Sequence, residues 1–190
     1  MKKDLGVLPA VFPMPVLIVA TYDENEKINV MNCGWAQVCD NDKIILYIGE
    51  TKKTFKNIEK CRAFTVSLAD EAHIAEADFV GIASGNTMED KFERTGFHAV
   101  PSTRVHAPLL EDFAVSMECE LLEIIPGAYV SGVVGKVINT RADESVLDEN
   151  GKIEPSKLHA VMFDYFKKGY YSVGPKVAQA WNAGTGLMKK

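Results

Sequence analysis

Apolar, β-branched residues come in short runs between polar turns, and this pattern predicts a chain made mainly of strands. Runs of about four to eight such residues bounded by turn residues are typical of strands. The runs are 16–22, 43–48, 62–69, 161–166 and 169–173. Residues 27–38 return as an extended segment after a polar turn at 23–26, so we expect a β-hairpin with the first strand.

The clearest alternation of apolar and polar residues lies between Phe113 and Leu121. Every second residue there is apolar, and Ser116, Glu118 and Glu120 occupy the opposite face. This predicts a half-buried strand on which the two glutamates are solvated charges rather than an acid–base pair. Pro126-Gly127 then turns the chain into a second long strand over 129–138, as a β-hairpin.

Four segments have helical patterns: 51–60, 70–83, 88–94 and 175–184. Gly96 is placed to end the third of them, and Pro175 to begin the fourth. The charged, turn-rich stretch 141–155 is predicted to be a mobile loop on the surface. Many short strands with inserted rather than alternating helices favour an antiparallel β-barrel over a βαβ sheet.

Composition limits the classes of function. The 190 residues are 47% hydrophobic and 25% charged, which fits one globular domain spanning 1–190. A net charge of −5 argues against nucleic acid as the main partner, although it permits a local basic pocket. Asp4 and several prolines interrupt the apolar N-terminal segment, and no signal-cleavage site follows. We therefore expect a cytoplasmic protein that binds no membrane.

Established catalytic and metal motifs are missing from the sequence. It contains no glycine-rich dinucleotide motif, no P-loop and no nucleophile elbow. The four cysteines include no C-x-x-C pair and the four histidines are scattered, so no metal site is expected. Cys33 is a nucleophile only if a histidine base reaches it, and a packed thiol is the favoured alternative.

Residues 29–57 contain the candidate chemistry. Thr51, Lys53 and Thr54 lie where the first helix is expected to begin. A helix N-terminus presents unpaired N–H groups and the positive end of the helix dipole, which suit an anion such as phosphate. Lysine and hydroxyl side chains add charge and donors. An ordinary capped surface helix explains the same residues, and the pattern alone leaves both interpretations open.

The order of several motifs resembles the flavin reductase-like family, and within it the flavoredoxins. The resemblance covers about 13–184. The motifs are Pro13-Met14-Pro15, Asn29 with 32–35, 54–58, Asp90-Lys91-Phe92, Ala107-Pro108-Leu109, Met117-Glu118-Cys119, 132–137, 171–174 and 181–184. The resemblance implies the FMN-binding split barrel, an antiparallel split β-barrel with inserted helices, and therefore FMN as cofactor.

The resemblance also implies a set of binding residues. The flavin would be lined by Asn32, Cys33, Gly34 and Trp35, its phosphate held by Thr51, Lys53 and Thr54, with Lys91 near the phosphate or ribityl chain. Three of these have simpler alternatives: Trp35 as a core residue, Lys91 as a solvated lysine and Thr54 as a helix cap.

Two departures from the family pattern affect the expected mechanism. The loop 39–42 replaces a Ser-x-Asp-Pro-Pro-like loop, and Tyr129 stands where relatives often carry a histidine. Tyrosine is not a base near neutral pH, which weakens any inference of direct hydride donation from NAD(P)H.

The family resemblance implies an FMN-dependent oxidoreductase, and a homodimer. Its electrons would come from NAD(P)H or from a reduced protein such as ferredoxin. The alternative is a non-catalytic FMN-binding protein, a store or sensor of the same fold.

Overall fold

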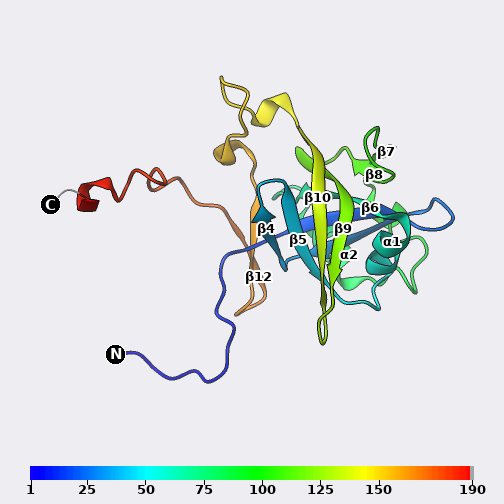
Figure 1. The fold of residues 1–190 in the computed structure, drawn as a ribbon, viewed down its shortest axis with the longest axis horizontal. Helices are drawn as coiled ribbons and strands as arrows, with labels where there is room; N and C mark the ends of the chain where they lie inside the picture. The colour runs from blue at the N-terminus through cyan, green and yellow to red at the C-terminus, as the bar shows by residue number, and fades with distance from the viewer. Residues whose placement is uncertain (189–190) are drawn as a thin grey trace.

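A seven-stranded antiparallel sheet forms the body of the molecule in a computed structural model that describes residues 1–188 (Figure 1). Its strands, in sheet order, are β3 (Ile28–Cys33), β2 (Leu17–Tyr22), β6 (Ala63–Leu68), β9 (Val115–Ile125), β10 (Ser131–Ala142), β5 (Lys43–Ile48) and β4 (Ala36–Asp40). The edge strands β3 and β4 are consecutive in the chain, so the short link between them requires the sheet to curl until its two edges approach each other. The mainly β, antiparallel fold predicted from the sequence is confirmed.

Two helices and two small sheets surround the body. The helices are α1 (Lys53–Cys61) and α2 (Ile74–Ile82). One small sheet pairs β1 (Met14–Pro15), β11 (Val161–Asp164) and β12 (Gly169–Ser172), and the other pairs β7 (Ala99–Pro101) with β8 (Pro108–Leu110). Short 3₁₀ turns are η1 (Glu93–Thr95), η2 (Glu144–Val146), η3 (Pro155–Lys157) and η4 (Thr185–Met188). No helix of the described chain is long and apolar enough to cross a membrane.

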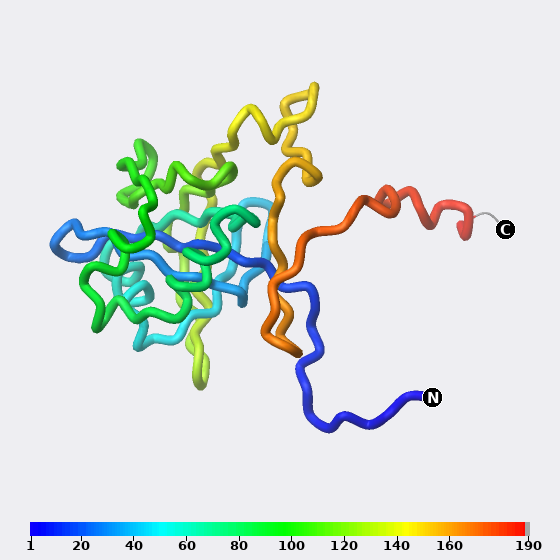
Figure 2. Tube along the Cα trace, turned by 180° about the vertical axis from the view of Figure 1, so that it is seen from behind, coloured from blue at the N-terminus to red at the C-terminus, as the bar shows by residue number. Residues whose placement is uncertain are grey.

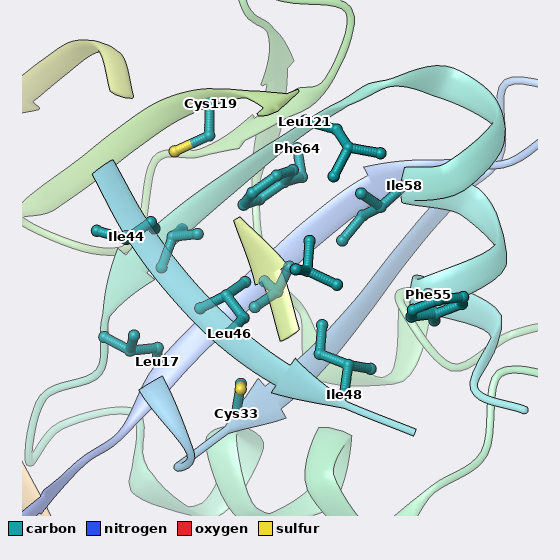
Figure 3. Packing of buried hydrophobic residues seen from close by; sticks show 13 residues of the cluster. Leu17, Cys33, Ile44, Leu46, Ile48, Phe55, Ile58, Phe64, Cys119 and Leu121 are labelled. Atoms are coloured by element: carbon teal, nitrogen blue, oxygen red, sulfur yellow. The ribbon is translucent and has the colours of Figure 1, made fainter. Parts of the chain in front are cut away.

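The main core lies inside the curled sheet and under α1. Leu46, Ile58 and Phe64 are fully buried there, and Figure 3 shows their side chains converging. Each such side chain contributes about 1.5–3 kcal/mol by leaving water. Gly135 lies directly against Phe64, because a Cβ at that position would come within 2.5 Å of the ring. A second cluster packs α2 and the loop after it against the other face of β2 and β3.

Two predicted helices are wrong. Residues 175–179 have no regular structure and 180–184 form turns, all of them exposed, because their apolar side chains are not buried against any other part of residues 1–188 and a short isolated helix is marginal in water. The segment 88–94 forms turns followed by η1, since Lys91 is drawn into the body of the protein. Gly96 does end this segment in the left-handed conformation, with a φ of 70°.

The interpretation of Glu118 as a solvated charge is also wrong. Its side chain is 0% exposed and accepts hydrogen bonds from Ser102 Oγ at 2.5 Å and Asn139 Nδ2 at 2.6 Å. The β7–β8 segment covers this part of β9, and therefore the polar face of the strand is buried at Glu118 as well. Glu120, at the next position on that face, is exposed as predicted.

Candidate functional site

A small basic pocket forms where the N-terminal end of α1 meets β3 and the loop after α2. Its volume is about 20 Å³. The lining residues are Asn29, Met31, Lys52, Lys53, Thr54, Val80, Gly81, Ala83, Ser84, Gly85 and Lys91. The structure therefore brings together Lys53, Thr54 and Lys91, which were predicted to lie at or near the phosphate and come from two segments far apart in the sequence.

The start of α1 leaves its positive end without an anion. Lys52 occupies the N-cap position in an extended conformation and makes no capping hydrogen bond through its side chain, and the first turn contains no acidic residue. Helices ordinarily begin with an oxygen-bearing cap that accepts from the first N–H groups. In α1 no side-chain cap accepts from these N–H groups. The N–H groups and the positive end of the helix dipole therefore suit an anion that comes from outside the chain.

Lys91 supplies a buried positive charge to the same pocket. Its residue is only 5% exposed, and within residues 1–188 it forms no ion pair or side-chain hydrogen bond. Burial, reinforced by the nearby charge of Lys52, lowers the pKa of Lys91 to about 8. The Lys91 side chain is mostly buried while its nitrogen keeps some contact with solvent. An ammonium in such a place without a counter-charge is costly, and an anion in the pocket would supply the missing partner. The alternative of a solvated Lys91 is wrong.

Lys53 and Thr54 are fixed by neighbours on the adjoining strands. Lys53 Nζ lies 2.9 Å from Asp23 Oδ2. Burial alone would raise the pKa of Asp23, but the Lys53 ammonium and two backbone N–H groups outweigh it and hold that pKa below its usual value. Thr54 is buried, and its Oγ1 accepts a hydrogen bond from Asn29 Nδ2 at 2.7 Å. The hydroxyl proton of Thr54 is therefore available for a ligand.

Two glycines allow the pocket walls to come close to one another. A Cβ on Gly85 would collide with Asn29 Oδ1 and come within 3.3 Å of the Lys53 side chain. A Cβ on Gly81 would come within 3.2 Å of the Asn32 side chain. Any larger residue would push the loop after α2 away from β3. Gly85 is not among the residues predicted for the site, because its role depends on contacts with Asn29 and Lys53, which are distant in the sequence.

Thr51 lies outside the pocket lining. It is exposed at the entrance to α1, and its carbonyl accepts a hydrogen bond from Asn86 Nδ2 at 2.9 Å. Lys52 lines the pocket in its place. The sequence from Thr51 to Thr54 predicts where the helix begins, but it does not predict which of these side chains line the pocket.

A larger, mostly apolar cavity lies at the other end of β3. Its volume is about 550 Å³, within the range of small-molecule sites. The body contributes Gly34, Trp35, Ala36, Gln37, Tyr47 and Tyr165, and the N-terminal arm contributes Pro9, Val11, Pro13, Met14 and Pro15. Trp35 is 45% exposed, so its interpretation as a core residue is wrong.

Asn32 and Cys33 lie on β3 between the two cavities but line neither. Asn32 Nδ2 donates to the Ala77 carbonyl of α2 at 3.0 Å. Cys33 is buried in the main core, where burial raises the pKa of its thiol to about 11 (Figure 3). A thiol so rarely ionised at neutral pH is no nucleophile, which supports the packed-thiol alternative.

The two cavities are linked through β3. Met31 lines the basic pocket, and Gly34, three residues later, lines the apolar cavity. At about 3.3 Å per residue, these positions are roughly 10 Å apart along the strand direction. The arrangement suits a ligand with an anionic group at one end and a flat apolar group at the other. Tyr129 lines neither cavity and is 94% exposed in the turn between β9 and β10.

Comparisons with known proteins agree with this geometry. The family model described as "Flavin reductase like domain" matches residues 10–174. Flavoredoxin of Desulfovibrio vulgaris (Miyazaki F) superposes with a TM-score of 0.91 at 32% identity, over 97% of this chain and 100% of that one. Flavoredoxin from Methanosarcina acetivorans gives 0.88 at 22% identity, over 98% and 100%. An FMN-binding protein from Thermus thermophilus, with bound 1-cyclohex-2-enone, gives 0.77 at 22%, over 94% and 98%.

Proposed function

The chain belongs to the flavin reductase-like domain family and has its split-barrel fold, and on that premise we propose that it is an FMN-dependent oxidoreductase. Electrons would come from NAD(P)H or a reduced protein such as ferredoxin and pass through bound FMN to an acceptor. One observation carries the proposal: β3 borders the basic pocket, which contains the unpaired Lys91, and leads to the apolar cavity beside Trp35. FMN has a phosphate and a flat ring system at its two ends, in the same order.

The donors and charges of the basic pocket suit a phosphate. The Lys91 ammonium, the Thr54 hydroxyl proton and the N–H groups at the start of α1 would hold it, while Lys53 is shared with Asp23. Charge-assisted bonds of this kind are each worth about 1.5–3 kcal/mol. Thr51 is kept as a proposed contact from the rim, through its exposed hydroxyl.

The apolar cavity fits the ring system. Trp35 would pack against the ring, and Gly34 would let the backbone approach it closely. Asn32 and Cys33 would take part through main-chain groups, because the Asn32 amide is bonded to α2 and the Cys33 thiol lies in the core. When bound, FMN supplies hydride and single-electron chemistry at its ring; the protein sets its orientation and access.

A second candidate, a non-catalytic FMN store or sensor, is favoured by one observation. The apolar cavity has no acidic residue, lysine or histidine in its lining, and its titratable side chains are Tyr47 and Tyr165. Neither is a base near neutral pH. A cation lies against the lining: the Nζ of Lys168 is 3.7 Å from the centre of the Tyr165 ring, although Lys168 does not itself line the cavity. We propose a homodimer in the cytoplasm, as the family resemblance implies.

The test is reconstitution with FMN followed by anaerobic reduction. We expect purified protein to bind FMN in a one-to-one ratio and the bound flavin to lose its visible absorbance on addition of NADPH, NADH or reduced ferredoxin. Protein that does not bind added FMN would refute the proposal. Protein that binds FMN, but is reduced by none of these donors faster than free FMN is, would favour the store or sensor.

A further inference from the structure

Lys53 lies at the boundary between the basic pocket and a further cavity. This cavity is a polar groove of about 420 Å³ between α1, the β2–β3 turn (residues 23–27) and the loop after α2. Apart from Gly85, every residue that lines the groove is charged or an asparagine. Figures 1 and 2 show the β2–β3 turn at the end of the body opposite the two termini. Lys53 lines both the groove and the basic pocket, so its ammonium can serve either one.

Asp23 begins the β2–β3 turn and lines only the groove. The residue is 8% exposed, and its Oδ1 accepts hydrogen bonds from the backbone N–H groups of Asn25 at 2.9 Å and Lys27 at 3.1 Å. The backbone N–H of Asp23 donates to the Lys27 carbonyl at 2.9 Å. The turn therefore fixes the carboxylate, and its Oδ2 faces Lys53 Nζ at 2.9 Å.

This ion pair weakens the attraction of Lys53 for any other anion. A carboxylate at hydrogen-bond distance opposes most of the field of the ammonium and takes up one of its three protons. The Lys53 side chain is 27% exposed and that of Asp23 is 9% exposed, so solvent screens the pair only in part. A phosphate in the basic pocket must either draw Lys53 away from Asp23 or bind beside a second negative charge. Both alternatives lower the affinity for the phosphate.

The other ion pairs of the groove do not affect the basic pocket in this way. Lys60 pairs with Glu24 at 2.6 Å. Lys27 pairs with Glu89 at 3.8 Å. All four side chains are more than half exposed, none of the four residues lines the basic pocket, and surface pairs of this kind contribute little. Among residues 1–188, Asp23 is the only carboxylate that pairs with a lysine of the basic pocket.

We propose that Asp23 limits the affinity of the basic pocket for a phosphate group, because it holds the Lys53 ammonium in an ion pair on the side of the groove. Asp23 is a positioning residue, since it acts through Lys53 and does not line the pocket. The inference rests on the FMN site of the proposed function and deepens it by assigning a residue that lowers the affinity for FMN. FMN should accordingly dissociate more readily than the lysines around its phosphate would suggest.

The first experiment removes the charge of Asp23 and keeps the turn. Asp23→Asn retains a side-chain oxygen for the two N–H groups of the turn, but its NH₂ group cannot accept from Lys53. In isothermal titration the variant should bind FMN about tenfold more tightly than the parent and riboflavin, which has no phosphate, within about twofold. The flavin-free variant should unfold at a lower temperature than the parent, because an ion pair is lost. A residue with only a structural role would not give tighter binding by a less stable protein.

Two further variants support this comparison. Glu24→Gln is the matched control, because it removes the same charge from the same turn but its partner is the exposed Lys60. This control should leave the FMN dissociation constant within about twofold. Asp23→Ser keeps a hydroxyl oxygen for the turn and should also bind FMN more tightly, so it replaces the asparagine variant if that one does not fold. FMN binding by a folded Asp23 variant that is unchanged or weaker would overturn the inference.

The second experiment tests whether Lys53 is the group that the substitution frees. In the Asp23→Asn background, Lys53→Met should weaken FMN binding about tenfold or more, because the freed ammonium makes the additional contact. The double variant has neither charge of the pair, so no unpaired carboxylate is left beside the pocket. Unchanged FMN affinity in the double variant would overturn the inference.

A titration with inorganic phosphate separates the inference from the proposed function. The rise in Tm of flavin-free protein measures phosphate binding, and Asp23→Asn should need about tenfold less phosphate than the parent for the same rise. If the parent does not bind FMN and the substitution still strengthens the phosphate response, the proposed function is refuted and the inference is supported. If the substitution alters neither FMN nor phosphate binding, the inference is overturned and the FMN proposal stands.

Discussion

Replacing Lys91 by methionine should stabilise the flavin-free protein and at the same time abolish tight FMN binding. The ammonium of Lys91 lies in the basic pocket without an acidic partner among residues 1–188, and its pKa is lowered from 10.5 to about 8. Methionine has a similar length and no charge. The substitution therefore removes the cost of the buried charge while keeping most of the packing.

The magnitude follows from the shift in pKa, which falls from 10.5 to about 8. Each pKa unit corresponds to about 1.36 kcal/mol, so the charged form costs at most about 3 kcal/mol in the folded state, because solvent that still reaches the Lys91 nitrogen screens part of the charge. The cost is fully present below pH 8. Between pH 8 and 10.5 the unfolded chain binds more protons than the folded one, so the stability of the parent rises with pH and the cost disappears.

Thermal unfolding of flavin-free protein measures this effect. At pH 7 Lys91→Met should raise the Tm by at most about 6–12 °C, at about 2–4 °C per kcal/mol for a chain of this size. Above pH 10.5 the difference from the parent should vanish. Lys56→Met is the matched control, because Lys56 is an exposed lysine on α1 that does not line the basic pocket. The control should change the free energy of unfolding by no more than about 0.5 kcal/mol.

Isothermal titration measures the second half of the prediction. Loss of one charge-assisted bond to the phosphate should weaken FMN binding by about ten- to a hundredfold and leave riboflavin, which has no phosphate, almost unchanged. If Lys91→Met lowers the Tm at pH 7, the charge is not a cost in the folded state. If it binds FMN as tightly as the parent, the phosphate does not meet Lys91. Either result would refute the reasoning.

Four further predictions concern the two cavities. FMN at a hundred times its dissociation constant should add about 2.7 kcal/mol of stability, or roughly 5–10 °C in Tm. FAD should add less, because the basic pocket has a volume of only about 20 Å³; equal shifts would mean that the pocket opens. Thr54→Ala should weaken FMN about tenfold and riboflavin less than twofold by titration, because it removes a hydroxyl donor. In a Trp181→Phe background, FMN should strongly quench the remaining Trp35 emission; unchanged emission with bound FMN would place the ring elsewhere.

The strands were predictable because their pattern depends on local chemistry. Apolar β-branched runs bounded by turns marked β2, β5 and β6 to within a residue or two, and both hairpins follow from the turn residues between them. Whether a segment is covered depends on residues distant in sequence. Alternation along β9 showed which side chains share a face, but it could not show that the β7–β8 segment covers Glu118.

The same limit applies to residues 175–184. Proline at the start, glycine at the end and apolar residues between them satisfy the local rules for a helix. The segment is not helical, because the fold offers it no surface to pack on and local preference alone does not stabilise a helix of this length.

The sequence could suggest an anion site at the start of α1, but it could not predict the full set of residues that line the basic pocket. Lys53 and Lys91 are 38 positions apart, and only the fold brings both to β3. The net charge of −5 gives no hint of a site where Lys52, Lys53 and Lys91 gather, with Asp23 paired to Lys53 alone. The two facts are compatible, because solvent and salt screen the exposed carboxylates over about 8–10 Å. A buried ammonium is screened much less, and Lys91 therefore dominates the field that an anion meets inside the pocket.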